Sequence, residues 1–159
     1  MSTRSRIAVM HGNNCKSIYC HRDGYLEYNG SLLNKHYDSA KANNLVALGD
    51  LSSLKPEIGI QHAFGYHGTE ISAEDYEKQF GNMCTFYGRD RGEKNVEFQT
   101  DTDFEAFIER VQGCYAELYY IMRDGVWYAG NVYESDAQFY KKLVPLAEAL
   151  AKLPEDAVV

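Results

Sequence analysis

The Asp124-Gly125 dipeptide, which separates two apolar runs, constrains the fold of this chain more than any other feature. The runs cover residues 115–122 and 126–129, and Asp-Gly between such runs is the strongest short-range signal for a β-hairpin. A second hairpin is predicted near the N-terminus, with strands over residues 6–10 and 15–21. Strands joined by short turns pair with each other, so the pattern predicts an antiparallel sheet built from hairpins.

Helical patterns occupy most of the remaining sequence. The clearest has apolar residues at intervals of three and four, at Phe104, Phe107, Ile108 and Val111. Helices are predicted over residues 28–37, 39–48, 72–80, 102–113 and 135–153. The predicted fold class is α+β: an antiparallel sheet built from hairpins, with helices packed on one face.

Capping residues and one proline set the predicted helix boundaries. Ser39, Ser72 and Thr102 are the expected N-caps, and Pro145 should kink or divide the last helix. A third hairpin is predicted from strands over residues 83–87 and 96–100, joined by a polar loop.

The length and apolar content fit one domain over residues 1–159, with loose ends at residues 1–3 and 154–159. No run approaches the ~20 apolar residues of a membrane helix, and the N-terminal segment lacks the apolar core of a signal peptide. We therefore expect no membrane partner. The cysteines lie in apolar segments, which is typical of buried free thiols in a reducing compartment and predicts a cytoplasmic location. They are Cys15, Cys20, Cys84 and Cys114.

The net charge of −7 makes nucleic acid an unexpected partner, because general binding to phosphate backbones needs a basic face. An acidic surface fits solubility and, less often, mimicry of nucleic acid toward a basic partner. The 13 tyrosines are unusual; most should pack in a strand-rich core and a few should line a pocket or interface. Tyr119, Trp127 and Tyr128 on the hairpin faces would allow a homodimer.

Common catalytic and cofactor motifs are absent from the sequence, including glycine-rich phosphate loops and zinc-protease or hydrolase motifs. Cys15 and Cys20 lie five apart on one strand, so they face opposite sides of the sheet and cannot share a zinc ion. His62 and His67 are better explained by solvation or hydrogen bonding than by a metal. We expect no metal or cofactor, and without a visible nucleophile–base pair a binding role is favoured over catalysis.

The turn that follows the second predicted strand holds the first group of candidate ligand-binding residues. Arg22 offers a planar fork of five donors suited to phosphate or carboxylate, Asp23 would orient it, and Tyr25 would stack on a ring. His21 precedes them. The simpler alternative is an ordinary Asp-Gly turn, with Tyr25 packed against the next helix.

Further cations are candidates for the same ligand. Arg89 and Arg91 lie in a loop flanked by glycines, which would wrap an anionic ligand or form a solvated hairpin tip. Arg4 and Arg6 share one face of the first strand, with Ile7 and Val9 on the other. The hypothesis is that these guanidinium groups converge on one cavity that binds a small anion, such as a nucleotide.

Several segments of the chain resemble a family of small proteins encoded by bacteriophages and prophages. They are STRSRIA, IYCHRDGY, HY, LGDLSSL and YGRDRGE, which begin at residues 2, 18, 36, 48 and 87. The resemblance implies a phage origin. It carries no established activity and no catalytic residue.

By analogy of context, the resemblance favours a small binding protein that counteracts host defence in the host cytoplasm. It would capture a nucleotide-like signal or block a host protein. Two alternatives are an enzyme acting on a nucleotide or phosphoester, with His21, His67 or Asp23 as acid or base, and a structural or assembly protein of the phage particle.

Overall fold

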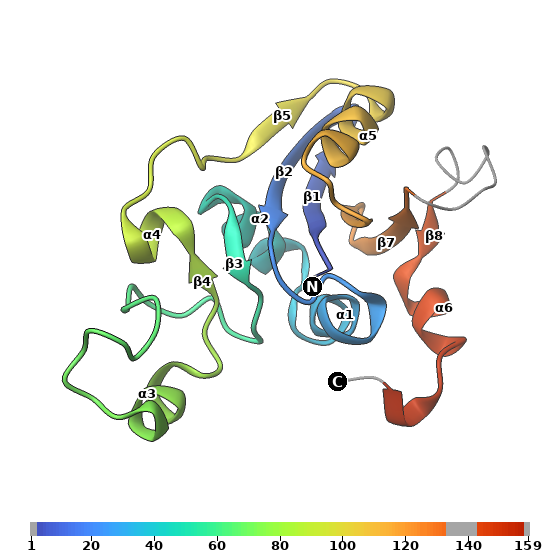
Figure 1. Cartoon of the computed structure of the whole chain (residues 1–159). Helices are drawn as coiled ribbons and strands as arrows, with labels where there is room; N and C mark the ends of the chain where they lie inside the picture. Colours follow the sequence, from blue (N-terminus) through green and yellow to red (C-terminus); the bar gives the residue numbers. More distant parts are fainter. Residues whose placement is uncertain (1–2, 133–142, 158–159) are drawn as a thin grey trace.

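A mixed β-sheet forms the centre of the molecule (Figure 1). The computed structural model describes residues 3–132 and 143–157. The long strands are β1 (Ser5–His11), β2 (Asn14–Cys20), β6 (Leu118–Arg123) and β7 (Val126–Asn131). The short ones are β3 (Leu51–Ser53), β4 (Thr85–Phe86), β5 (Gln99–Asp101) and β8 (Val144–Pro145). Their order is β4-β3-β2-β1-β6-β7-β8, and β5 also pairs with β2.

Two of the predicted hairpins are confirmed. β1 and β2 are antiparallel around the turn after His11, and β6 and β7 are antiparallel around Asp124-Gly125. Asp124 and Gly125 have φ values of +51° and +79°, the left-handed conformation that a two-residue hairpin turn of this kind requires. The local turn residues Asp124 and Gly125 therefore account for the β6–β7 hairpin.

The α+β class is confirmed, but the expectation of a purely antiparallel sheet is wrong. β1 runs parallel to β6, with Ser5 opposite Leu118, and β2 runs parallel to β3. These pairings join segments far apart in the sequence, and hairpin turns carry no information about them. The result is a mixed sheet, which is common when distant segments meet at its centre.

Helices cover both faces of the sheet, contrary to the expectation of one. Ile7 and Val9 face a core cluster with residues of α1 (Ser31–His36), α2 (Ser39–Ala47) and α6 (Leu146–Ala151). Ala8 and Met10 face a second cluster with α5 (Phe104–Gly113). Figure 1 shows α5 and α2 on opposite sides of β1 and β2. Strand β1 is buried from Ser5 to Met10, and a strand buried on both faces needs cover on both.

The third predicted hairpin is wrong. β4 pairs with β3 and β5 pairs with β2, so neither strand pairs with the other. Between them the chain forms α4 (Tyr87–Arg91), and Gly92 ends it at a φ of +72°. The Asp90 carboxylate accepts from the backbone N–H groups of Phe86 and His62, which stabilises this helical turn in place of a loop.

Helix starts shift by one residue from two of the predictions. Asp38 caps α2 and Asp103 caps α5, one residue away from Ser39 and Thr102 respectively. Ser72 caps α3 (Ala73–Phe80), as predicted.

The expected helix over residues 28–37 is divided into the π-helical turn η1 (Leu26–Gly30) and α1. α6 begins directly after Pro145, while the expected start of the last helix, Ser135, lies outside the described residues.

The expected dimer surface and the expected loose C-terminal end both differ in the structure. Tyr119 and Trp127 are buried, because both faces of the sheet are covered, so they do not supply a dimer surface. Near the C-terminus, η3 (Glu155–Ala157) is a 3₁₀ turn; residues 1–2 and 158–159 of the expected loose ends lie outside the described residues. No helix within residues 3–132 and 143–157 is long and apolar enough to cross a membrane.

Candidate functional site

Four segments of the chain, which begin at residues 2, 18, 48 and 87, meet at one end of the sheet. β2 ends beside β3, where the N–H groups of His21 and Arg22 donate to the carbonyl oxygens of Leu51 and Ser52 at 3.0 and 3.1 Å. The Gly24 N–H donates to Thr3 O at 2.8 Å, which ties the turn after β2 to the start of β1.

Asp50 connects the segment that begins at Tyr87 to this end of the sheet. Its side-chain Oδ1 accepts from the Tyr19 N–H at 2.9 Å, and its carbonyl oxygen accepts from the Tyr87 N–H at 3.2 Å. We call the set Arg4, Tyr19, His21, Arg22, Asp50 and Tyr87 the sheet-end site. On the face of the sheet that α5 covers, the second core cluster lies at the other end of the strands. Every member of the sheet-end site retains some exposure to solvent.

Tyr19 and His21 form the centre of the site. They alternate along β2 and so share a face, and the Tyr19 hydroxyl is hydrogen-bonded to His21 Nδ1 at 2.8 Å. Burial raises the pKa of Tyr19 to about 12, although Arg4 acts in the opposite direction. Burial, with Arg4 and Arg22 nearby, lowers the pKa of His21. Both side chains are therefore uncharged near neutral pH, and His21 Nε2 forms no hydrogen bond within residues 3–132 and 143–157.

Arg4 and Arg22, the two cations that act on His21, have no carboxylate partner among the described residues. After burial, the charges of Arg4 and Arg22 contribute to the lowered pKa of His21, and Arg4 directly precedes Ser5, which pairs with Cys20. Within residues 3–132 and 143–157, neither guanidinium group forms an ion pair or a hydrogen bond. Two uncompensated guanidinium groups next to a neutral imidazole form a surface suited to an anion.

Arg6 lies opposite Tyr19 in the β1–β2 pairing, but its guanidinium group is engaged inside the protein. Only 4% of the residue is exposed. Its Nε and Nη2 donate to Ser17 Oγ and Ser17 O at 2.7 and 3.2 Å, and Nη1 lies 3.8 Å from Cys114 Sγ. The predicted face separation of Arg6 from Ile7 is confirmed, but Arg6 acts as a buried structural group.

Arg89 is also structural. Its Nη1 donates to Ile58 O and Gly59 O at 2.9 and 3.2 Å, and its Nη2 donates to Cys84 O at 2.9 Å. Its Nε donates to Asp90 Oδ1 at 2.9 Å. With these donors engaged, Arg89 joins α4 to the preceding chain and is not available to a ligand.

Arg91 borders the sheet-end site through Tyr87. The Arg91 guanidinium lies 4.5 Å from the Phe64 ring centroid and 5.4 Å from that of Tyr87. It also forms an ion pair with Glu93 at 2.6 Å. The charge of Arg91 is therefore already compensated, unlike those of Arg4 and Arg22.

The three other predicted site residues, Asp23, Tyr25 and His67, are not part of the sheet-end site. Asp23 is in the turn after β2 with a φ of +56°, and Tyr25 contacts Tyr28 with ring centroids 6.2 Å apart. His67 lies against Tyr66 in the loop before α3, with ring centroids 4.2 Å apart. Of the eight predicted residues, His21 and Arg22 belong to the site and Arg91 borders it.

Three residues of the site were not among the candidate residues of the sequence: Tyr19, Asp50 and Tyr87. The two-residue period of β2 was a usable signal for Tyr19, because it places this residue on the same face as His21. For Asp50 and Tyr87 no local pattern existed, since both reach the site through the β3 and β4 pairings.

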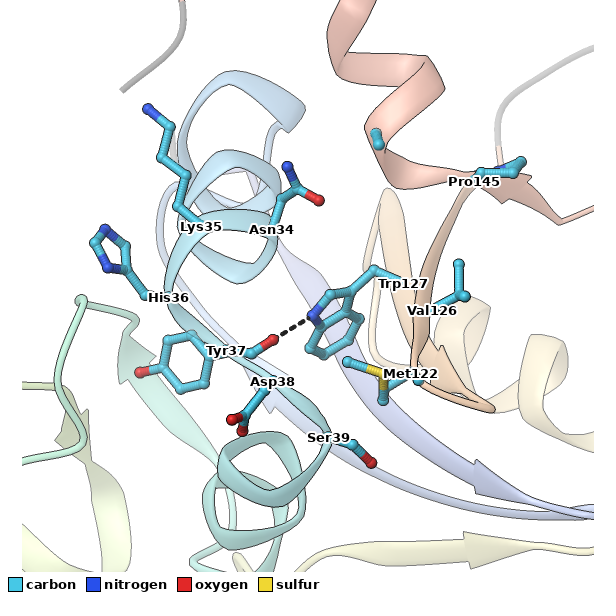
Figure 2. A pocket seen from close by; sticks show the side chains of 12 residues that line it. Asn34, Lys35, His36, Tyr37, Asp38, Ser39, Met122, Val126, Trp127 and Pro145 are labelled. Atoms are coloured by element: carbon cyan, nitrogen blue, oxygen red, sulfur yellow. Dashed lines mark hydrogen bonds between the residues drawn. The ribbon is translucent and has the colours of Figure 1, made fainter.

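A separate cavity of about 490 Å³ lies near the opposite end of β1 (Figure 2). Met122 and Trp127 form its apolar floor, and the Trp127 indole N–H donates to Tyr37 O at 2.8 Å. Figure 2 shows the side chains of Lys35 and His36 on its rim pointing away from the indole. Because its floor is apolar and these two side chains point away from the indole, this cavity is less suited to an anion than the sheet-end site.

The described part of the chain shows neither a metal-binding cluster nor a reactive thiol at Cys15 or Cys20. There, no group of three His, Cys, Asp or Glu side chains is placed to hold a metal ion. Cys15 and Cys20 belong to the clusters on opposite faces, as predicted, and burial raises the pKa of each thiol to about 12. Such thiols are poor nucleophiles at neutral pH.

No family model, curated protein or solved structure matches this chain. The functional inference therefore depends on the residues and geometry of the sheet-end site.

Proposed function

We propose that this protein binds a small phosphate-bearing ligand at the sheet-end site. The observation that carries the proposal is the pair of guanidinium groups of Arg4 and Arg22, which have no ionic partner within residues 3–132 and 143–157 and act on the neutral Tyr19–His21 pair. The whole chain has a net charge of −7, so two cations at one place that have no ionic partner among the described residues are unusual.

Guanidinium groups recognise phosphate by charge-assisted hydrogen bonds, which are stronger than neutral ones. Like charges beside His21 disfavour a further positive charge, and a bound anion would relieve that repulsion. A neutral imidazole in the middle also supplies a hydrogen-bonding nitrogen. Together these features favour a phosphate group over an uncharged ligand.

The resemblance to phage proteins gives this binding role a context. We propose capture of a nucleotide-like signal in the host cytoplasm as the way in which the protein counteracts host defence. Blocking of a host protein and a role in particle assembly are the rival proposals. Each of these requires a protein partner, which the two free arginines do not by themselves explain.

Thermal unfolding with inorganic phosphate, pyrophosphate and a panel of linear and cyclic nucleotides tests the proposal. A ligand present at 100 times its Kd stabilises the folded state by about 2.7 kcal/mol. For a domain of this size that raises Tm by roughly 5–10 °C. The substitution Arg22→Ala should abolish most of this rise.

Arg123→Ala is the matched control, because Arg123 lies at the far end of β6, opposite Met10 of β1. It removes the same charge away from the site and should leave the ligand-induced rise intact. No stabilisation by any compound of the panel, or equal losses in both variants, would contradict anion binding at the sheet-end site.

An enzymatic role on the same ligand is the second candidate. His21 is neutral and its Nδ1 is fixed by Tyr19, and burial raises the pKa of the nearby Asp50 carboxyl group. These are properties of general acid–base groups. Chromatography of the incubated nucleotides tests it: turnover that His21→Ala abolishes would favour an enzyme, and unchanged ligands would favour capture.

A further inference from the structure

Beside the sheet-end site, the planar guanidinium group of Arg91 is held in place by two aromatic rings and one carboxylate. Its guanidinium lies over the Phe64 and Tyr87 rings, whose centroids are 5.6 Å apart at an interplanar angle of 30°. Its Nε also donates to Glu93 Oε2 at 2.8 Å. A guanidinium fixed by two rings and a carboxylate loses little side-chain entropy when a ligand stacks on it.

The Arg91 surface is suited to stacking and not to phosphate. Half of the side chain, 51%, is exposed to solvent, which leaves part of the group accessible. Glu93 compensates its charge, so a second anion gains less there than at Arg4 or Arg22. Guanidinium planes and aromatic rings are the common stacking partners of nucleobases in proteins.

Tyr87 joins this surface to the anion-binding residues. The backbone N–H groups of Tyr87 and Tyr19 donate to two oxygens of the same residue, Asp50. Burial is the main cause of the raised pKa of Tyr19, and Tyr87 contributes in the same direction. A ligand with its phosphate at His21 therefore has a stacking surface within the same region of the protein.

We propose that the ligand of the sheet-end site is a nucleotide, with its phosphate bound by Arg4 and Arg22 and its base stacked on Arg91 beside Tyr87. This inference rests on the proposed function and adds the base as the group that the protein recognises. Phe64 and Glu93 act as positioning residues, since they hold the guanidinium plane.

Calorimetric titration with ribose 5-phosphate and with adenosine and uridine 5′-monophosphates separates the two contributions. The sugar phosphate reports the anion site alone, and the nucleotides add a base. Stacking of one base should make the nucleotides about tenfold tighter ligands than ribose 5-phosphate.

The informative variant is Arg91→Lys, which keeps the charge and removes the plane. It should bind ribose 5-phosphate as the unmodified protein does and lose the tenfold preference for nucleotides. Arg123→Lys is the matched control, because Arg123 also lies over a tyrosine ring, 4.7 Å from the Tyr128 centroid, but at the other end of the sheet. It should keep the preference.

A second variant, Phe64→Leu, removes the ring behind Arg91 without touching any charge and should weaken nucleotide binding alone. Circular dichroism establishes that each variant is folded. Equal affinity for ribose 5-phosphate and nucleotides, or a preference that survives in Arg91→Lys, overturns the base-stacking inference and leaves anion binding standing. Absence of binding by all three compounds overturns the proposed function itself.

Discussion

The arginines of this chain differ in what their guanidinium groups contact. Arg6 and Arg89 donate to backbone or side-chain oxygens inside the protein, and Arg91 is compensated by Glu93. Arg4 and Arg22 have no such partners in the described residues. Since a guanidinium stays charged at all ordinary pH values, the environment alone decides whether it is structural or available to a ligand.

The titration of His21 should report directly on its two cationic neighbours. Burial, Arg4 and Arg22 lower its pKa from the ordinary value of 6.5. Arg22→Ala removes one of these causes, so the pKa of His21 should rise toward 6.5 in an NMR titration of the ring protons. Arg123→Ala should leave it unchanged, and an unchanged value in Arg22→Ala would place Arg22 away from His21.

Bound anion should move the same pKa upward. An anion favours the imidazolium form, so binding takes up a proton and affinity increases as the pH falls toward the pKa of His21 in the free protein. Sulfate is a suitable probe because its own charge is constant in this range. If the sulfate affinity of the unmodified protein and of His21→Asn had the same pH dependence, His21 would not border the anion.

The ring of Tyr119 on β6 occupies the space that a side chain at Gly130 of β7 would need. A Cβ atom added there would overlap the ring of Tyr119, which is fully buried and cannot move aside. Gly130→Ala should lower the free energy of unfolding by about 1–3 kcal/mol, as measured by urea denaturation. Gly113→Ala is the control, since its added Cβ meets no atom within 4 Å, and it should be neutral or slightly stabilising.

At the scale of elements, the helix starts show how neighbouring residues compete for one role. Asp38 precedes Ser39, and Thr102 precedes Asp103, so each boundary offers two good capping residues. The carboxylates of Asp38 and Asp103 accept from the N–H groups of Lys41 and Ala106 at 2.8 and 2.7 Å. The approach of the chain to each helix, and not residue type, selected the cap.

Truncation of the two candidates at α5 tests this assignment. Asp103→Ala should lower the free energy of unfolding by about 1 kcal/mol, because the Ala106 N–H loses its acceptor. Thr102→Ala should change it by less than about half of that, since Thr102 is exposed. Thermal or urea unfolding measures both, and the reverse order would assign the cap to Thr102.

At the scale of the whole molecule, one sheet supports two core clusters. β1 and β6 contribute side chains to both, so neither face can lose its helices without exposing the strands that hold the other. The sheet-end site lies where the cover on the second face stops. Its polar side chains can remain partly exposed there without uncovering the core.

Unfolding of the two faces should therefore be cooperative. Phe107→Ala leaves a cavity in the core cluster under α5. It should lower the free energy of unfolding by about 3–5 kcal/mol. Trp127, the only tryptophan, lies in the opposite cluster, so its fluorescence reports the other face. In urea, the fluorescence and circular dichroism transitions should shift together; separate midpoints would show two independent units. Ile60→Ala, at a residue 64% exposed, is the neutral control.

The sequence by itself determined the features that depend on neighbouring residues. Asp124-Gly125 specified the β6–β7 hairpin, and the spacing from Phe104 to Val111 specified α5 with its buried face. The alternation along β1 placed Arg6 and Ile7 on opposite faces. Turn geometry and side-chain period act over a few residues, which is why these predictions hold.

Only the tertiary structure decided how distant segments meet. The parallel pairing of β1 with β6 and the position of Tyr87 beside Tyr19 depend on long-range packing, which no local pattern encodes. The same packing engaged Arg6 and Arg89, whereas Arg4 and Arg22 have no side-chain partner in the part of the chain that the structure describes. A residue type states what a side chain can bind, whereas the fold determines which of its partners are already present.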